Sequence, residues 1–87
     1  MANQLLRSGT SIGANVSEAQ AAQSKKDFTS KMAIASKESR ETSYWLELLI
    51  ATKILPEAHL TPLMNESNEI IAILTSIVKT SQLNTQN

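Results

Sequence analysis

The stretch from Gln4 to Leu49, QLLRSGTSIGANVSEAQAAQSKKDFTSKMAIASKESRETSYWLELL, decides the fold of this chain. Apolar residues recur along it at intervals of three and four, which is the period of an amphipathic α-helix. No segment alternates apolar and polar residues over the length of a strand, and two prolines and two glycines are too few for a turn-rich β domain. The sequence therefore predicts an all-α fold.

The first predicted helix covers about residues 2–22. The apolar residues that share one of its faces are Leu5, Ile12, Val16 and Ala19. Gly9 and Gly13 lie four residues apart on the edge of that face, and each glycine costs about 1 kcal/mol relative to alanine inside a helix. We interpret the pair as a site of close approach by another backbone.

The second predicted helix covers about residues 24–54 and starts at Ser24, whose spacing to Asp27 resembles a capping box. A heptad seam runs along it through Phe28, Met32, Ala35, Ser39, Thr42, Leu46 and Leu49. A second apolar stripe consists of Ile34, Trp45 and Leu48. Two apolar faces predict that this helix contacts two neighbours.

The third predicted helix covers about residues 61–81. Pro56 is expected to end the second helix, Thr61 to cap the third, and Pro62 to be its first residue. Its inward row is Leu63, Ser67, Ile70, Leu74 and Ile77. We therefore expect residues 1–87 to form one domain, an antiparallel up-and-down bundle of three helices, with residues 82–87 as a frayed tail.

Composition excludes several classes of protein. Eight basic and eight acidic side chains cancel, so the chain lacks the strong positive field of a dedicated nucleic-acid binder. It has no cysteine for disulfides or thiolate metal sites. No apolar run approaches the ~20 residues of a membrane span, and the first residues lack a secretory pattern. We expect a cytoplasmic protein without a membrane partner.

No set of residues in the sequence points to catalysis, a metal or a cofactor. His59 is the only histidine, and we expect it in a solvent-facing connection. The segment SGTSIG lacks the GxGxxG and GK[ST] patterns of phosphate loops. Glu38 and Glu41 could serve acid–base chemistry as paired carboxylates. We favour a structural role, in which they pair with Lys37 locally or with Arg7 across a helix or subunit boundary.

Three patches in order, LLRSGTSIGANVSEAQ, SKKDF and ASKESRETSYWLELL, resemble the four helix bundle protein family, also called the 23S rRNA intervening-sequence proteins. The resemblance covers about residues 4–54. It implies an up-and-down helical bundle and a homo-oligomer, with homopentamers as the precedent in the family. Relatives that accompany diversity-generating retroelements bind nucleic acid and a reverse transcriptase, whereas most members have no assigned activity.

Members of this family carry a further long helix upstream of the QLLRSGTSIG block, and this sequence begins almost at that block. A naturally short protein, a start assigned late and a fragment are all open explanations. Without that helix, we expect an exposed apolar groove, which neighbouring chains fill.

Two surfaces of the second helix are candidate binding sites. One is a basic arc opposite the heptad seam, expected to contact nucleic acid, with Tyr44 available to stack on a base; its members are Lys25, Lys26, Lys37, Arg40 and Tyr44. Residues 24–54 carry six basic and four acidic residues, whereas residues 55–87 carry one and three. The other surface is a candidate subunit interface made of Ile34, Glu38, Glu41, Trp45 and Leu48.

The function that we expect is therefore non-enzymatic. The leading hypothesis is an oligomeric accessory protein that binds RNA through a basic arc made multivalent by assembly. The competing hypothesis is a structural protein–protein interaction module that docks helices in the groove and has no nucleic-acid role.

Overall fold

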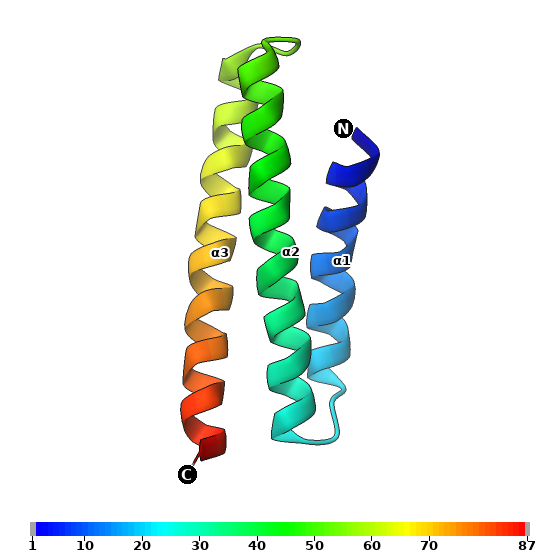
Figure 1. The fold of residues 1–87 in the computed structure, drawn as a ribbon, viewed down its shortest axis with the longest axis vertical. Coiled ribbons are helices and arrows are strands. Elements are labelled where there is room, and N and C mark those ends of the chain that lie inside the picture. The colour runs from blue at the N-terminus through cyan, green and yellow to red at the C-terminus, as the bar shows by residue number, and fades with distance from the viewer. Residues whose placement is uncertain (1, 87) are drawn as a thin grey trace.

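The computed structural model describes residues 2–86, which form three long antiparallel helices (Figure 1). They are α1 (Ala2–Gln20), α2 (Lys25–Thr52) and α3 (Glu57–Gln86). No strand occurs among residues 2–86. The predicted all-α fold of three up-and-down helices is confirmed, although several helix ends differ from the prediction.

Local signals explain both ends of α2. The side chain of Ser24 accepts a hydrogen bond from the Asp27 amide over 3.0 Å, as the predicted cap requires. At the other end Lys53 adopts a left-handed conformation with φ 57°, and its amide donates to the Ile50 carbonyl. The helix therefore ends at Thr52 through this left-handed cap, not at Pro56 as predicted.

The predicted start of α3 is wrong. The helix begins at Glu57, directly after Pro56, so Thr61 and Pro62 lie inside it. Thr61 is not a cap, because its hydroxyl donates to the Glu57 carbonyl over 2.9 Å. Leu60 is buried, which anchors the first turn to the bundle. The proline that precedes the helix start is thus Pro56, and Pro62 lies inside the helix, where it offers no backbone N–H.

The far end of α3 extends beyond the predicted boundary at residue 81. The helix continues to Gln86, so residues 82–86 of the expected frayed tail are helical, and residue 87 lies outside the described residues. Fraying concerns the opening of these turns in solution and stays a prediction.

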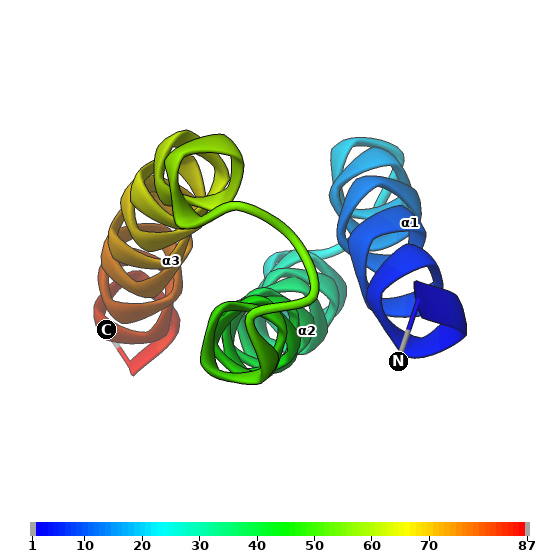
Figure 2. The same cartoon turned by 90° about the horizontal axis from the view of Figure 1, so that it is seen from above.

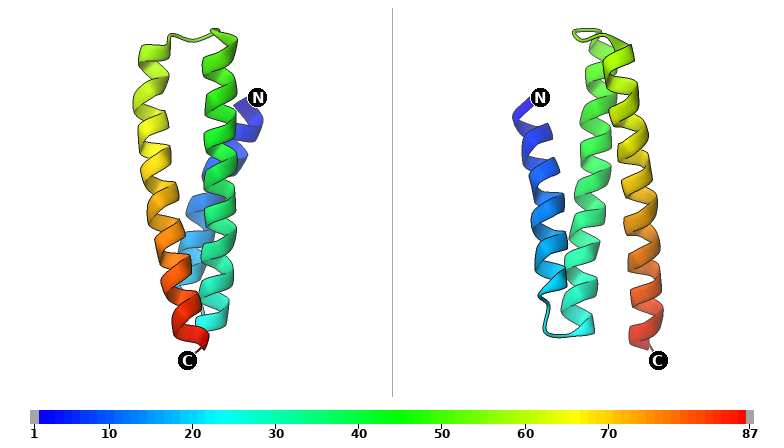
Figure 3. Two further views of the ribbon diagram at one scale, coloured as in Figure 1. Left: turned by 60° about the vertical axis from the view of Figure 1, so that its left-hand side comes forward. Right: turned by 180° about the vertical axis from the view of Figure 1, so that it is seen from behind.

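The helices form an open arrangement with α2 in the middle. Helices α1 and α3 both pack on α2, and within residues 2–86 no Cα atom of α1 lies within 8 Å of one of α3. Seen from above, α1 and α3 lie toward the same side of α2 (Figure 2). With 19 residues against 28, α1 covers only part of α2, as the view from behind shows (Figure 3). The fold is therefore a trough with α2 as its floor.

One end of the trough is closed by a hydrophobic core, which we call the closed half. Its buried centre consists of Ala19, Met32, Ala35 and Leu74, one or two residues from each helix. The side chains packed around this centre are Ile12, Val16, Phe28, Ile77 and Val78. The predicted inward faces of all three helices therefore meet here, which confirms the helical periods read from the sequence.

Small hydroxyl residues fill the contact between α1 and α2. Ser8 is fully buried, and its hydroxyl accepts a hydrogen bond from the Thr42 hydroxyl over 2.8 Å. Ser8 in turn donates to the Leu5 carbonyl. The buried Ser39 donates to the Ser36 carbonyl over 2.6 Å. Because these polar groups have partners, they stay buried at little cost, and the bond between Thr42 and Ser8 joins α2 directly to α1.

Candidate functional site

An apolar groove of about 650 Å³ opens between α1 and α3 at the end of the trough away from the closed half. Its floor is the continuation of the heptad seam of α2, through Ser39, Thr42, Leu46 and Leu49. Ser39 and Leu46 of this floor are buried, and Thr42 and Leu49 are half-buried, so the exposed apolar area of the groove lies in its walls. An apolar groove is thus present among the described residues, as the sequence led us to expect.

Apolar side chains form the walls of the groove, and several of them are exposed. On the α1 side Leu5, Leu6 and Ile12 line it, and on the α3 side Leu63 and Ile70 do so. Leu6 is 68% exposed, Leu63 49% and Ile70 40%. Single exposed apolar residues are ordinary, but several around one groove mark an interaction surface.

The groove carries almost no charge. Glu66 is the one charged residue among the described residues that line it. Helix α1 has two charged side chains, Arg7 and Glu18, and both pair with α2 on the outer side of the bundle. Depletion of charge is typical of the buried centre of protein interfaces.

The two glycines of α1 have no packing role within one chain. A Cβ atom placed on Gly9 or Gly13 would have nothing within 4 Å among the described residues that could obstruct it. The predicted close approach by another backbone is therefore wrong for the single chain. Gly9 lies in the groove wall beside Thr10, so both glycines face space that no part of the described chain fills.

An ion-pair network joins α1 to α2 on the outer side. The Arg7 guanidinium contacts the Glu38 carboxylate over 3.3 Å and also the Glu41 carboxylate. Lys31 pairs with Glu18 over 2.7 Å. The predicted pairing of the two glutamates with Arg7 across a helix boundary is confirmed, and the network orients α1 on α2 instead of forming an acid–base pair.

Glu41 is the most strongly held carboxylate of this network. The hydrogen bond from Arg7, and after it the hydrogen bond from the Trp45 indole over 3.4 Å, lowers the pKa of Glu41 below its ordinary value of 4.5. The same hydrogen bond raises the pKa of Arg7. Both groups therefore stay charged near neutral pH.

The residues of the predicted subunit interface are only partly covered in one chain. Ile34 is 40% exposed, and Trp45 and Leu48 are half-buried. Glu38 and Glu41 are also half-buried, but their partner is Arg7 of the same chain. This surface thus leaves apolar area uncovered, and its role as an interface stays a prediction.

The predicted basic arc is exposed along α2. All of its members lie at the surface: Lys25, Lys26, Lys37, Arg40 and Tyr44. Arg40 donates to the Thr75 hydroxyl of α3 over 3.0 Å, and Tyr44 packs edge-on against Trp45 with ring centroids 5.2 Å apart. Lys26 and Lys37 share the outer side of α2 with them, whereas Lys25 lies beside a second cavity.

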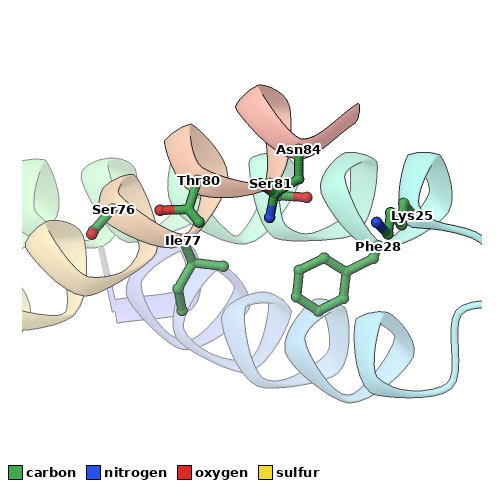
Figure 4. Close-up of a pocket in the computed structure, with 7 residues that line it drawn as sticks. All are labelled: Lys25, Phe28, Ser76, Ile77, Thr80, Ser81 and Asn84. Carbon is green, nitrogen blue, oxygen red and sulfur yellow. The ribbon is translucent and has the colours of Figure 1, made fainter. Parts of the chain in front are cut away.

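The second cavity lies between the start of α2 and the end of α3 and has about 370 Å³. Figure 4 shows Lys25 and Phe28 of α2 beside the last turns of α3, where Ser76 and Thr80 lie. Its lining contains no carboxylate and no histidine among the described residues. The groove, with about 650 Å³, is the larger of these two cavities.

The side chains that could bind a metal ion do not cluster in the part of the chain that the structure describes. No group of three or more His, Cys, Asp or Glu residues that could hold a metal ion occurs between residues 2 and 86. His59 is exposed as expected, but it lies in the first turn of α3 and not in a connection. Of the helices described, none combines the length and apolarity of a membrane span.

The chain matches one family of known proteins, and its fold matches a solved structure. A family model described as 23S rRNA-intervening sequence protein matches residues 1–76. The chain is similar to a solved protein of unknown function from the S23 ribosomal protein family of Bacteroides thetaiotaomicron, with 53% identity and a TM-score of 0.84. The match covers 88% of this chain and 71% of that one. No curated protein matches the chain.

Proposed function

The chain belongs to the 23S rRNA-intervening sequence protein family, and we propose that it acts without catalysis, as a self-assembling helical bundle whose groove is covered by a second copy of the chain. The observation that carries this proposal is the exposed apolar groove over the α2 seam. Of the two hypotheses from the sequence, the geometry favours the protein–protein interaction module.

The size of the chain supports assembly. A domain of 87 residues buries only roughly 60–65% of its unfolded surface, and the walls of the groove leave Leu6, Leu63 and Ile70 exposed. Covering Leu6, Leu63 and Ile70 removes apolar surface at about 25 cal/mol per Å². Assembly therefore supplies stability that the single chain lacks.

One edge of helix α1 matches the chemistry of the groove. The groove accepts an uncharged, apolar helix edge, because only Glu66 among its described lining residues is charged. The groove-facing edge of α1 has this chemistry, with Leu6, Gly9 and Thr10. A second copy is therefore chemically matched to the groove without any foreign partner.

Sedimentation equilibrium tests self-assembly. We expect a mass above the 9.5 kDa of one chain at micromolar concentration, and a return to the monomer mass for Ile70→Asp, which places a charge in the groove. The matched control is Ile54→Asp, because Ile54 is exposed in the connection and does not line the groove. A monomer at every concentration, or equal loss of assembly in both variants, would contradict the proposal.

A second candidate function is contact with nucleic acid through the outer side of α2. The observation that favours it is the exposure of Lys26, Lys37 and Arg40 beside Tyr44. One copy presents few phosphate contacts, but an assembly repeats them, so that binding becomes multivalent.

A salt titration of RNA binding tests this second function. We expect binding to generic RNA that weakens steeply from low to physiological salt, and that weakens further in Lys26→Glu with Arg40→Glu. Lys53→Glu with Lys79→Glu changes the net charge equally on other parts of the surface and is the control. An assembled wild-type protein that binds no RNA at low salt would leave assembly as the only function.

A further inference from the structure

We infer that the outer side of α2 binds single-stranded RNA by stacking an unpaired base on the exposed ring of Tyr44. This inference rests on the second candidate function, contact with nucleic acid, and adds the class of ligand, which is a strand whose bases are unpaired. The site lies outside the groove, because Tyr44 is not among the described residues that line the groove.

Tyr44 is an exposed aromatic side chain in a sequence that has few of them. The chain contains one phenylalanine, one tyrosine and one tryptophan. Phe28 packs against the core of the closed half, whereas Tyr44 is 54% exposed. A ring that stays in water contributes little to the stability of the fold. A ligand that covers the ring therefore gains apolar contact that the fold leaves unused.

The ring of Tyr44 is held by Trp45. The two rings pack edge-on, with centroids 5.2 Å apart and an angle of 69° between their planes. The Trp45 indole in turn donates to the Glu41 carboxylate over 3.4 Å, and Arg7 pairs with that carboxylate and compensates its charge. An edge-on contact covers at most one face of the Tyr44 ring, so a face stays available for a base.

Basic side chains continue from Tyr44 toward the start of α2. Arg40 precedes it by four residues and Lys37 by seven, which places them about 6 Å and about 10 Å away along the helix axis and within about 40° around it. Both are exposed, and Lys26 continues the same row. Glu47, three residues after Tyr44, is also exposed and repels phosphates. The strand that stacks on Tyr44 therefore extends toward Lys37.

A stacking ring distinguishes a single strand from a duplex. The bases of a duplex are already stacked on one another, whereas unpaired bases stack on aromatic side chains with little dependence on sequence. Phosphate contacts carry no such information. A protein contact centred on Tyr44 is the alternative, but lysine is depleted at protein interfaces, and Lys37 lies beside the ring. The surroundings of Tyr44 thus favour an unpaired strand.

Titration with three RNAs tests the inference: oligoadenylate, an abasic strand of equal length and an RNA duplex. We expect the wild type to bind oligoadenylate at least about tenfold more tightly than the abasic strand, since stacking adds to the phosphate contacts. Oligoadenylate should also change the fluorescence of Trp45, the only tryptophan, more than the duplex does. This preference should be lost in Tyr44→Ala and kept in Tyr44→Phe. The matched control is Ile54→Ala, which removes an exposed side chain from the connection.

The results separate failure of the inference from failure of the function on which it rests. Equal affinities of the wild type for oligoadenylate and the abasic strand, or a preference that survives in Tyr44→Ala, overturn base stacking and leave contact with nucleic acid intact. Absence of binding to all three RNAs at low salt overturns both. A wild type without the preference, whose self-assembly is lost in Tyr44→Ala, assigns the ring to a protein contact and also overturns the inference. The wild-type comparison involves no substitution, so it decides even where Tyr44→Ala fails to fold.

Discussion

The closed half and the groove half of this bundle are built from the same three helices, yet one is a core and the other is a surface. Leu74 of α3 is 5% exposed in the closed half, whereas Leu63 of the same inward row is 49% exposed in the groove. The difference lies in what α1 brings to each half, because Ala19 packs on Met32 and Ala35 but Gly9 leaves open space. An amphipathic period sets which side of a helix points inward, and the number of neighbours decides whether that side is buried.

The largest expected effect is on the stability of the closed half. Leu74→Ala should lower the free energy of unfolding by about 2–4 kcal/mol, because it leaves a cavity in a buried cluster. Ile70→Ala, one turn away in the groove, should cost less than about 1 kcal/mol in dilute protein, since its side chain is already partly in water. Urea unfolding at low micromolar concentration measures both, and equal losses would refute the division into two halves.

Protein concentration should have the next largest effect, which is on the apparent stability of the wild type. If a second copy covers the groove, a tenfold rise in concentration above the dissociation constant adds about 1.4 kcal/mol to the apparent stability of the dimer. The thermal midpoint of the wild type should therefore rise with concentration, and that of Ile70→Asp should not. Calorimetry over a hundredfold concentration range tests this, and a constant wild-type midpoint would speak against assembly.

A smaller effect is expected from substitution of a glycine in α1. It should stabilise the single chain and weaken assembly. Gly13→Ala should stabilise the single chain by about 0.5–1 kcal/mol, because a methyl group has room there and alanine favours the helix. If a second copy packs on this edge of α1, the same methyl group should weaken assembly. Unfolding of dilute protein and sedimentation of concentrated protein measure the two effects. Tighter assembly of Gly13→Ala would show that this edge of α1 is not a contact.

The smallest effect is expected on the stability of the fold at acid pH. The depressed pKa of Glu41 means that its interaction with Arg7 stabilises the fold fully above its ordinary value near 4.5 and is lost as the pH falls through its folded value. Glu41→Gln should therefore reduce the loss of stability in acid. Arg7→Gln should raise the pKa of Glu41 toward its ordinary value, as followed by carboxyl NMR. Glu47→Gln is the control for Glu41→Gln, because it removes the same charge from α2. An unchanged titration of Glu41 in Arg7→Gln would contradict the assigned cause of the lowered pKa.

The sequence predicted more about the faces of the helices than about their ends. The heptad seam of α2 and the cap at Ser24 follow from spacing, and the structure confirms them. For Glu41 the sequence left two partners open, Lys37 and Arg7, and the structure shows Arg7. The start of α3 was wrong because two prolines offered competing signals, and burial of Leu60, a tertiary effect, decided between them. Local rules could not include that effect.

The candidate site could be predicted only in outline. The resemblance to the family implied a groove, but no sequence pattern showed that Gly9 would line it with nothing packed against it. Nor did spacing indicate that Ser8 would be the buried contact of α1 on α2, with Thr42 as its partner. Such contacts depend on how helices distant in sequence meet, although a serine on the inward face between Leu5 and Ile12 is a signal that could have suggested it.

Methyl NMR spectra over a dilution series give the most direct test of whether a second copy covers the groove. We predict that the methyl resonances of Leu6, Leu63 and Ile70 shift or broaden as the concentration rises, whereas those of Leu74 in the closed half stay constant. Groove resonances that are independent of concentration from micromolar to millimolar, together with a monomer mass, would contradict the account.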